Sequence, residues 1–289
     1  MIVLMAEHNH TNNPGNAKRN TATSHSAPHS GRSGRPRPMR ERDGRRRGPE
    51  MQRESAPSVE LPHTKFLGWR RGIATESLVP GQKVYGEDLL QIEGMEFRSW
   101  NPTRSKLAAA LLKGMHIRLS EDLRILYLGV SSGTTASHVS DIVRNGIIFG
   151  VDFAPRVLRE FVQLSETRKN LVPVFGNSSL PEEYDYLIPG EVDMIYQDVA
   201  QPNQVQILSK NAETFLKKGG MAVLMIKARS ISVARDPNSI FTEELEKLKE
   251  AGFRILETRR LEPFEKDHLA VVLEYDGGAR KRRVDRAYL

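Results

Sequence analysis

Residues 123–143 read LRILYLGVSSGTTASHVSDIV. The apolar run at 123–128 predicts a buried strand, and Thr134 and Thr135 open a predicted helix whose first N–H groups favour anionic or polar ligand groups. A loop of small residues, which lets a ligand approach the backbone closely, lies between them: Gly129, Ser131, Ser132 and Gly133. Because ligands of open α/β sheets bind at the carboxyl ends of strands, this stretch predicts a nucleotide-type ligand.

The spacing of the glycines also excludes two common nucleotide sites. The loop does not read Gly-x-Gly-x-x-Gly, as a dinucleotide fold requires, and it does not end in the Gly-Lys-Ser/Thr of a phosphate loop. A nicotinamide-dependent dehydrogenase is therefore disfavoured.

Strands and helices alternate on both sides of this stretch, which predicts a parallel sheet covered on both faces. The last two predicted strands are joined without a helix, so one of them should run antiparallel. The pattern predicts an α/β, Rossmann-like, seven-stranded fold of methyltransferases that use S-adenosylmethionine. The predicted strands are 123–128, 147–151, 171–175, 192–197, 220–226, 253–259 and 269–275, and the predicted helices are 134–143, 155–165, 203–216 and 239–250.

Composition divides the chain into four predicted parts. Residues 1–57 are rich in polar residues, Gly, Pro and Arg, and are expected to form a disordered basic tail. Residues 58–100 form a small β-rich subdomain, with strands expected at 66–69, 83–85 and 95–100. The methyltransferase domain follows at 101–275, beginning with a helix at 105–112, and a basic C-terminal tail occupies 276–289.

The net charge of +7 is concentrated in the two tails. Residues 1–57 carry eleven Lys/Arg and five Asp/Glu, and residues 276–289 carry five and two, so that 58–275 have a net charge of −2. Basic tails either contact a polyanion such as nucleic acid or serve only as solubilising arms. The chain has no cysteine, which excludes disulfides and fits a reducing interior, and no apolar run is long enough to span a membrane.

Polar residues follow the second and third strands of the predicted sheet. Asp152 lies in register to accept hydrogen bonds from ribose hydroxyls, or it is the N-cap of the helix that begins at Pro155. Phe153 offers a surface for an adenine ring. Asn177 and Ser178 follow the third strand, where a side-chain amide either contacts adenine or only shapes a turn.

The fourth and fifth strands end on groups of opposite charge. Asp198 orients a nucleophile or accepts its proton, or it caps the helix that begins at 203. Lys227 follows six apolar residues, and the strand end is the place that avoids burying an unpaired charge. Lys106 and His268 are unremarkable in their local sequence.

Five separated motifs occur in order over residues 62–275: NPTRSK at 101–106, YLGVSSGTTASHVSD at 127–141, DVAQP at 198–202, IKARS at 226–230 and LEPFEKDH at 261–268. Together they resemble fibrillarin in its archaeal-type form.

The resemblance implies S-adenosylmethionine-dependent 2′-O-methylation of ribose in ribosomal RNA, and in archaea also in transfer RNA. The family works in a particle with a box C/D guide RNA, a Nop-domain scaffold protein and a kink-turn-binding ribosomal-type protein. It implies a catalytic set of Lys106, Asp198, Lys227 and His268. It also implies donor contacts, beside the loop glycine Gly129, from Thr134, Thr135, Asp152, Phe153, Asn177, Ser178, Asp198, Val199, Ala200 and Gln201.

Two features depart from the family pattern. Members commonly carry Asp and Ala where this chain has Asn177 and Ser178, and Asn keeps an acceptor oxygen for adenine. The tail lacks the Arg-Gly-Gly repeats of eukaryotic members. An intracellular protein is therefore expected, cytoplasmic if archaeal and nucleolar only if eukaryotic.

The implied reaction is an in-line attack of a ribose 2′-oxygen on a sulfonium methyl carbon. Asp198 and Lys227 are expected to hold the hydroxyl and help remove its proton, with Lys106 and His268 completing the cluster. The proton acceptor is left open. The alternatives are methylation of a protein glutamine and a non-catalytic subunit of an RNA particle.

Overall fold

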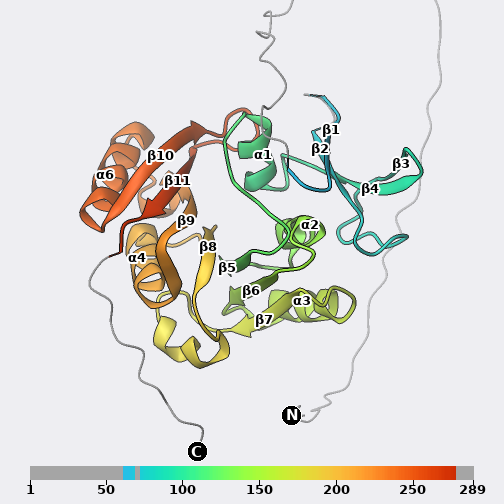
Figure 1. The fold of residues 1–289 in the computed structure, drawn as a ribbon. Helices are drawn as coiled ribbons and strands as arrows, with labels where there is room; N and C mark the ends of the chain where they lie inside the picture. Colours follow the sequence, from blue (N-terminus) through green and yellow to red (C-terminus); the bar gives the residue numbers. More distant parts are fainter. Residues whose placement is uncertain (1–60, 69–71, 278–289) are drawn as a thin grey trace, which may run out of the picture. The chain divides into compact units, whose positions relative to one another are not determined.

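A seven-stranded sheet forms the centre of the computed structural model, which describes residues 61–68 and 72–277 (Figure 1). Its strands lie in the order β10-β11-β9-β8-β5-β6-β7. The strand β11 runs opposite to the other six, which are all parallel to one another. The predicted fold class and the antiparallel end are confirmed. The strands are β5 (Arg124–Leu128), β6 (Ile147–Asp152), β7 (Leu171–Phe175), β8 (Val192–Gln197), β9 (Leu216–Lys227), β10 (Phe253–Arg260) and β11 (His268–Tyr275).

Helices cover both faces of this sheet. The helices α1 (Lys106–Leu112), α2 (Thr134–Ile142) and α3 (Pro155–Thr167) share one apolar core with Ile125 and Tyr127 of β5. The helices α4 (Gln204–Phe215) and α6 (Pro237–Glu250) share a second core with Leu126 and Leu128. Successive residues of β5 thus face opposite cores, which is why this strand reads as a continuous apolar run.

The boundaries of the predicted helices agree with those observed to within two residues. The differences are at β9, which begins at Leu216 rather than 220, and at three short helical segments that the sequence did not reveal. These are α5 (Ala228–Ile231) and two 3₁₀ turns at Pro181–Glu183 and Asp185–Leu187.

A separate four-stranded antiparallel sheet precedes α1, in the order β1-β2-β4-β3. Its strands are β1 (Thr64–Phe66), β2 (Ile73–Glu76), β3 (Leu89–Ile92) and β4 (Met95–Trp100). The β-rich character and the strand at 95–100 are as expected. The strand at 66–69 is wrong, since β1 ends at Phe66 and Trp69 lies outside the described residues.

The strand predicted at 83–85 is also wrong, because these residues form a loop. The carboxylate of Glu87 accepts hydrogen bonds from the backbone N–H groups of Val84 and Tyr85, at 2.8 to 3.1 Å. These donors therefore have no need of a neighbouring strand, and the apolar residues of the segment do not become part of a ladder. The strands β2 and β3 were not predicted.

A buried carboxylate fastens the four-stranded sheet to α2. Asp141 of α2 is fully buried and lies between two buried guanidinium groups, 2.8 Å from Arg98 of β4 and 2.7 Å from Arg168. It also accepts hydrogen bonds from the hydroxyl of Thr75 and the backbone N–H of Leu78. Both carboxylate oxygens are thus fully used, which a buried charge requires.

His138, one turn earlier on α2, extends the same buried cluster. Its ring is stacked on Trp100 at 4.9 Å, and its Nδ1 lies 2.7 Å from the Thr75 hydroxyl, whose proton goes to Asp141. Burial holds the pKa of His138 well below its ordinary value, so the ring is neutral. Nδ1–H therefore donates to Thr75, and Nε2 lies 2.7 Å from the hydroxyl of Tyr85, whose single proton also faces the carbonyl of Ser99 at 3.0 Å.

The predicted basic tails lie outside the described residues, apart from Asp276 and Gly277. The four predicted domain boundaries stay predictions. Within residues 61–68 and 72–277, none of the helices has the length and apolar character needed to cross a bilayer.

We expect Asp141→Asn to destabilise the protein by about 3–5 kcal/mol, because it removes the ion-pair partner of the buried Arg168 and leaves the buried Arg98 with Glu87 as its one carboxylate among the described residues. Urea unfolding followed by circular dichroism measures this change. The matched control is Glu246→Gln, which breaks an exposed ion pair with Lys249 and should leave the unfolding midpoint unchanged. A wild-type midpoint for Asp141→Asn would contradict the stabilising role of the cluster.

Candidate active site at the carboxyl edge of the sheet

A pocket of about 280 Å³ lies where the β5–α2 loop, the ends of β8 and β9 and the start of α1 meet. It contains many of the predicted residues, namely Lys106, Gly129, Thr134, Thr135, Asp198, Val199, Ala200 and Lys227. It also contains residues that were not selected, namely Arg104, Tyr127, Val130, Ser131 and Ser132. Arg104 belongs to the NPTRSK motif and the two serines belong to the loop, so the sequence contained a signal that could have identified these three residues as part of the site.

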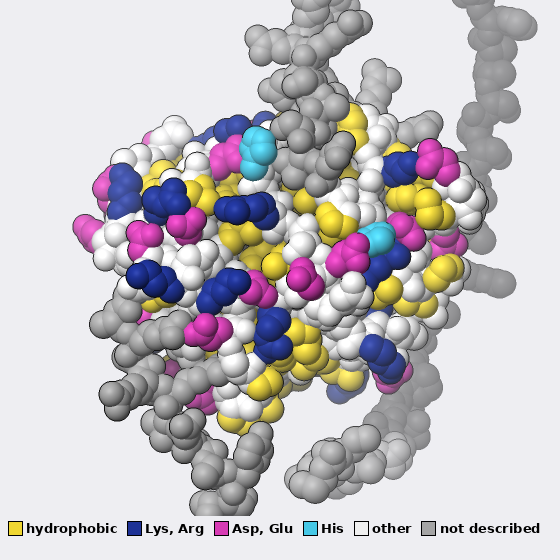
Figure 2. Space-filling model, in the orientation of Figure 1, with side chains coloured by type: hydrophobic (Ala, Val, Ile, Leu, Met, Phe, Trp, Pro, Cys, Tyr) yellow, Lys and Arg dark blue, Asp and Glu magenta, His cyan; other side chains and the backbone are white. Residues whose placement is uncertain are grey.

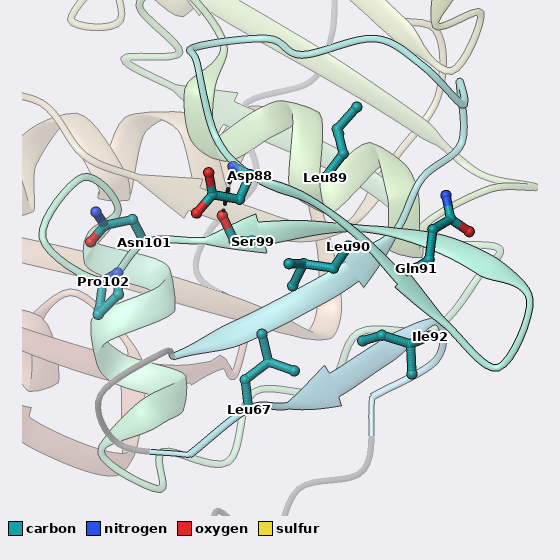
Figure 3. Close-up of a pocket in the computed structure, with 9 residues that line it drawn as sticks. All are labelled: Leu67, Asp88, Leu89, Leu90, Gln91, Ile92, Ser99, Asn101 and Pro102. Atoms are coloured by element: carbon teal, nitrogen blue, oxygen red, sulfur yellow. Dashed lines mark hydrogen bonds between the residues drawn. The ribbon is translucent and has the colours of Figure 1, made fainter.

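A larger pocket of about 750 Å³ lies on the four-stranded sheet and contains none of the predicted residues. Figure 3 shows the side chains of Leu67, Leu90 and Ile92 lying toward one another in it. Its one carboxylate is that of Asp88. Size alone therefore does not locate the polar site, which is the smaller pocket.

Close contact between two strand ends shapes the polar pocket. Gly129 has a φ of +80°, and a Cβ at this position would lie 2.5 Å from the carbonyl oxygen of Asp198. The N–H of Asp198 in turn donates to the carbonyl of Leu128 at 3.0 Å. Only glycine both adopts this backbone conformation and leaves room for the neighbouring strand end.

Asp152 holds the far side of the loop. One carboxylate oxygen accepts the N–H of Ser131 and the other accepts the N–H of Ala154, both at 2.9 Å. The predicted alternative, in which Asp152 is the N-cap of the next helix, is wrong because the N-cap of α3 is Ala154. Each oxygen accepts one hydrogen bond from the described residues, and a carboxylate oxygen can accept two, so Asp152 keeps capacity for ribose hydroxyls.

Exposed aromatic rings stand beside Asp152. Phe153 follows β6 with 58% of its surface exposed, and Phe175 ends β7 with 61% exposed. Asp152 and Phe175 are partners in the register of the sheet. Apolar rings exposed at a strand end offer a flat surface for a planar ligand, and Phe175 was not recognised as a candidate.

The loop after β7 is held by its own side chains. The Asn177 side-chain oxygen accepts the N–H of Ser179 at 3.0 Å, so Asn177 does shape a turn. Ser178 is buried, and its carbonyl accepts from the Asn211 amide. The Gln201 side chain accepts from the Ser179 hydroxyl at 3.0 Å and so connects this loop with the segment after β8. None of Asn177, Ser178 and Gln201 lines the polar pocket.

The ammonium of Lys106 lies 3.0 Å from a carboxylate oxygen of Asp198, and both side chains are about one fifth exposed. α1 reaches this position because its N-cap, Ser105, accepts a hydrogen bond from Thr135 at the start of α2. Lys227 lies at the end of β9, where Gln204 bonds to both its N–H and its carbonyl. The structure thus brings Lys106, Lys227 and Asp198 to one pocket, with Lys106 paired to the carboxylate.

His268 begins β11 directly opposite Lys227 in the register of the sheet, but it does not line the pocket. It is 5% exposed, and its Nδ1–H donates to the carbonyl of Lys266 at 2.7 Å. Nε2 is buried and has no hydrogen-bond partner among the described residues. Burial lowers the pKa of His268, so the ring is neutral and Nε2 carries a lone pair.

The known proteins that resemble this chain belong to the same family as the sequence motifs indicated. The family model for fibrillarin matches residues 65–277. A fibrillarin-like rRNA/tRNA 2′-O-methyltransferase of Methanocaldococcus jannaschii is 49% identical over 206 residues, covering 71% of this chain and 89% of the relative.

Two solved structures are also similar. Fibrillarin of Aeropyrum pernix, with natively bound S-adenosyl-L-methionine, has a TM-score of 0.65 and 47% identity, covering 70% of this chain and 88% of that one. The fibrillarin of a fibrillarin/Nop5p complex has a TM-score of 0.68 and 38% identity, covering 75% and 98%.

We expect Gly129→Ala to weaken binding of the predicted donor at least about tenfold, because its Cβ would push apart the two strand ends that form the pocket. Calorimetric titration with S-adenosylmethionine measures the effect. The control is Gly252→Ala, which has a similar φ of +83° but open space around it. Both variants should lose about 1–2 kcal/mol of stability to backbone strain, and equal donor affinity in both would contradict the steric argument.

Proposed function

The chain belongs to the fibrillarin family, and we propose that it transfers the methyl group of S-adenosylmethionine to ribose 2′-hydroxyls of ribosomal RNA and transfer RNA. The observation that carries this proposal is the ion pair of Asp198 with Lys106, in a pocket that Lys227 and the Gly129 loop also line.

The residues around the pocket suit the donor. Asp152 has acceptor capacity for the two ribose hydroxyls, and Phe153 offers an exposed ring to adenine. The small residues from Gly129 to Thr135 leave space for the methionine portion. The contact of the Asn177 amide with adenine rests on the family resemblance. A phosphate grip is unnecessary because this donor carries no phosphate. The contacts of Ser178 and of Val199 to Gln201 rest on the family resemblance.

When bound, S-adenosylmethionine supplies an electrophilic methyl group on a cationic sulfur. The remaining difficulty is the hydroxyl nucleophile, which is a very weak acid. Asp198 accepts a hydrogen bond from this hydroxyl and orients it, while Lys227 stabilises the negative charge that develops on the oxygen. Lys106 fixes the carboxylate of Asp198 through the ion pair at 3.0 Å.

His268 lies opposite Lys227 in the sheet and is not among the residues that line the pocket. Its neutral ring lies next to Lys227 in the sheet, and a protonated ring would add a further cation close to Lys106. We therefore assign His268 a positioning role within the catalytic set, in which the neutral state keeps the local charge balanced.

The charge of the chain supports a need for partners. Residues 58–275 have a net charge of −2, and Figure 2 shows acidic and basic side chains interspersed over the face drawn. Such a surface holds RNA weakly. A Nop-domain scaffold protein of the kind found with fibrillarin in the solved complex would bring the substrate to the site, together with a box C/D guide RNA and a kink-turn-binding protein. An intracellular location, cytoplasmic for an archaeal-type member, stays a prediction.

We expect Lys227→Ala and Asp198→Ala each to reduce the rate of methyl transfer by about 10²–10⁴-fold, as for the loss of a group that assists proton transfer. Single-turnover transfer of labelled methyl measures this rate. Donor affinity should survive better in Lys227→Ala, because only Asp198 belongs to the expected donor contacts. Lys249→Ala, which removes an exposed cation of α6, is the control, and near-normal rates for the site variants would contradict their roles.

A reconstituted reaction tests the acceptor. The chain with the scaffold protein, the kink-turn-binding protein and a guide RNA should place label on the 2′-oxygen of the guided nucleotide, and omission of the scaffold protein should abolish it. Nuclease digestion and chromatography of the nucleosides identify the product. Label on a glutamine of an added protein, with none in RNA, would contradict the proposal.

A further inference from the structure

Arg104 stands out in the donor pocket as a cation without a counter-charge. It lies between β4 and α1, two residues before Lys106, and its side chain is exposed. Among the side chains that line this pocket, it is the one guanidinium. Within the described part of the chain, no carboxylate forms an ion pair with it, whereas Lys106 is already paired with Asp198.

The guanidinium of Arg104 is nevertheless held in place. It lies 5.1 Å from the centre of the Tyr85 ring, within the range of a cation–π interaction. The Tyr85 hydroxyl lies 2.7 Å from Nε2 of His138 and 3.0 Å from the carbonyl of Ser99. Burial raises the pKa of Tyr85 to about 12, so the phenol keeps its proton at physiological pH.

Charge is arranged unequally within the pocket. The carboxylate of Asp198 lies at the end of β8, which suits the cationic parts of the donor, its ammonium and its sulfonium. Arg104 shares the pocket with Ser132 and Thr134 at the first turn of α2. The only anionic group of S-adenosylmethionine is its α-carboxylate, and a guanidinium binds a carboxylate through two parallel hydrogen bonds.

We propose that Arg104 binds the α-carboxylate of the methyl donor and that Tyr85 positions the guanidinium for this contact. The loop that carries Tyr85 belongs to the four-stranded sheet region, so this part of the chain contributes to cofactor selection. The proposal concerns the donor alone and holds whichever acceptor takes the methyl group.

A second pocket of about 490 Å³ shares Arg104, Ser132 and Thr134 with the donor pocket and is also lined by Lys83 and Tyr85. A phosphate of the RNA strand would be the competing ligand for Arg104 from that side. Replacement of Arg104 should lower affinity for the donor if the residue binds the donor carboxylate, and affinity for RNA if it binds a phosphate.

The test compares two donors that differ only in the carboxylate, S-adenosylmethionine and decarboxylated S-adenosylmethionine. By calorimetric titration of the full chain, Arg104→Met should weaken binding of S-adenosylmethionine about tenfold or more and leave binding of the decarboxylated form unchanged. Arg104→Lys should recover part of the loss, because it keeps the charge without the planar fork.

The matched control is Lys83→Met, which removes a cation that lines only the neighbouring pocket and should not change affinity for either donor. Thermal unfolding of each variant checks that the fold is intact. Equal weakening of both donors by Arg104→Met would overturn the proposal. Unchanged donor affinity with a raised KM for RNA in the reconstituted reaction would overturn it in favour of a phosphate contact.

Discussion

The carboxylate of Asp141 is enclosed between the guanidinium groups of Arg98 and Arg168, all three side chains being buried. This ion cluster joins the four-stranded sheet to α2, the helix whose first turn forms part of the donor pocket. Removing these three charges from water is costly, and hydrogen bonds from Thr75 and Leu78 help to offset this cost by completing the carboxylate shell. The position of α2 therefore depends on residues far from it in sequence.

The same cluster reaches the ligand site through neutral groups. His138 of α2 connects Thr75 with Tyr85, and the ring of Tyr85 supports Arg104 at the pocket. On the other side of the pocket, the close approach of Gly129 to the backbone of Asp198 sets the distance between the glycine loop and the end of β8. The pocket is thus held rigidly from two directions, which is the condition for placing a methyl donor and a hydroxyl in line.

The separation of roles among the polar residues follows from where the strands end. Asp152 ends β6 and Asp198 follows β8, the two strands that lie on either side of β5. Asp152 supports the glycine loop, whereas Asp198 pairs with Lys106. His268 lies in the sheet beside Lys227 and is not among the residues that line the pocket. Of the four residues in the predicted catalytic set, Lys106, Asp198 and Lys227 therefore line the pocket, and His268 does not.

Local sequence was sufficient for the elements of the seven-stranded sheet and for the donor loop, because apolar runs, small residues and helix starts express short-range constraints. It was insufficient at 83–85, where Glu87 captured the backbone donors, and at β2 and β3, which are short strands of the smaller sheet.

The sequence by itself determined the fold class and the cofactor class through the stretch at 123–143, and its motifs predicted a catalytic set through their resemblance to fibrillarin. Only the tertiary structure decided that Asp152 bonds to the loop rather than capping a helix, that His268 is not among the residues lining the pocket, and that Arg104 lines it next to Tyr85. The reason is physical: these outcomes depend on contacts between segments distant in the chain, and local propensity contains no information about such contacts.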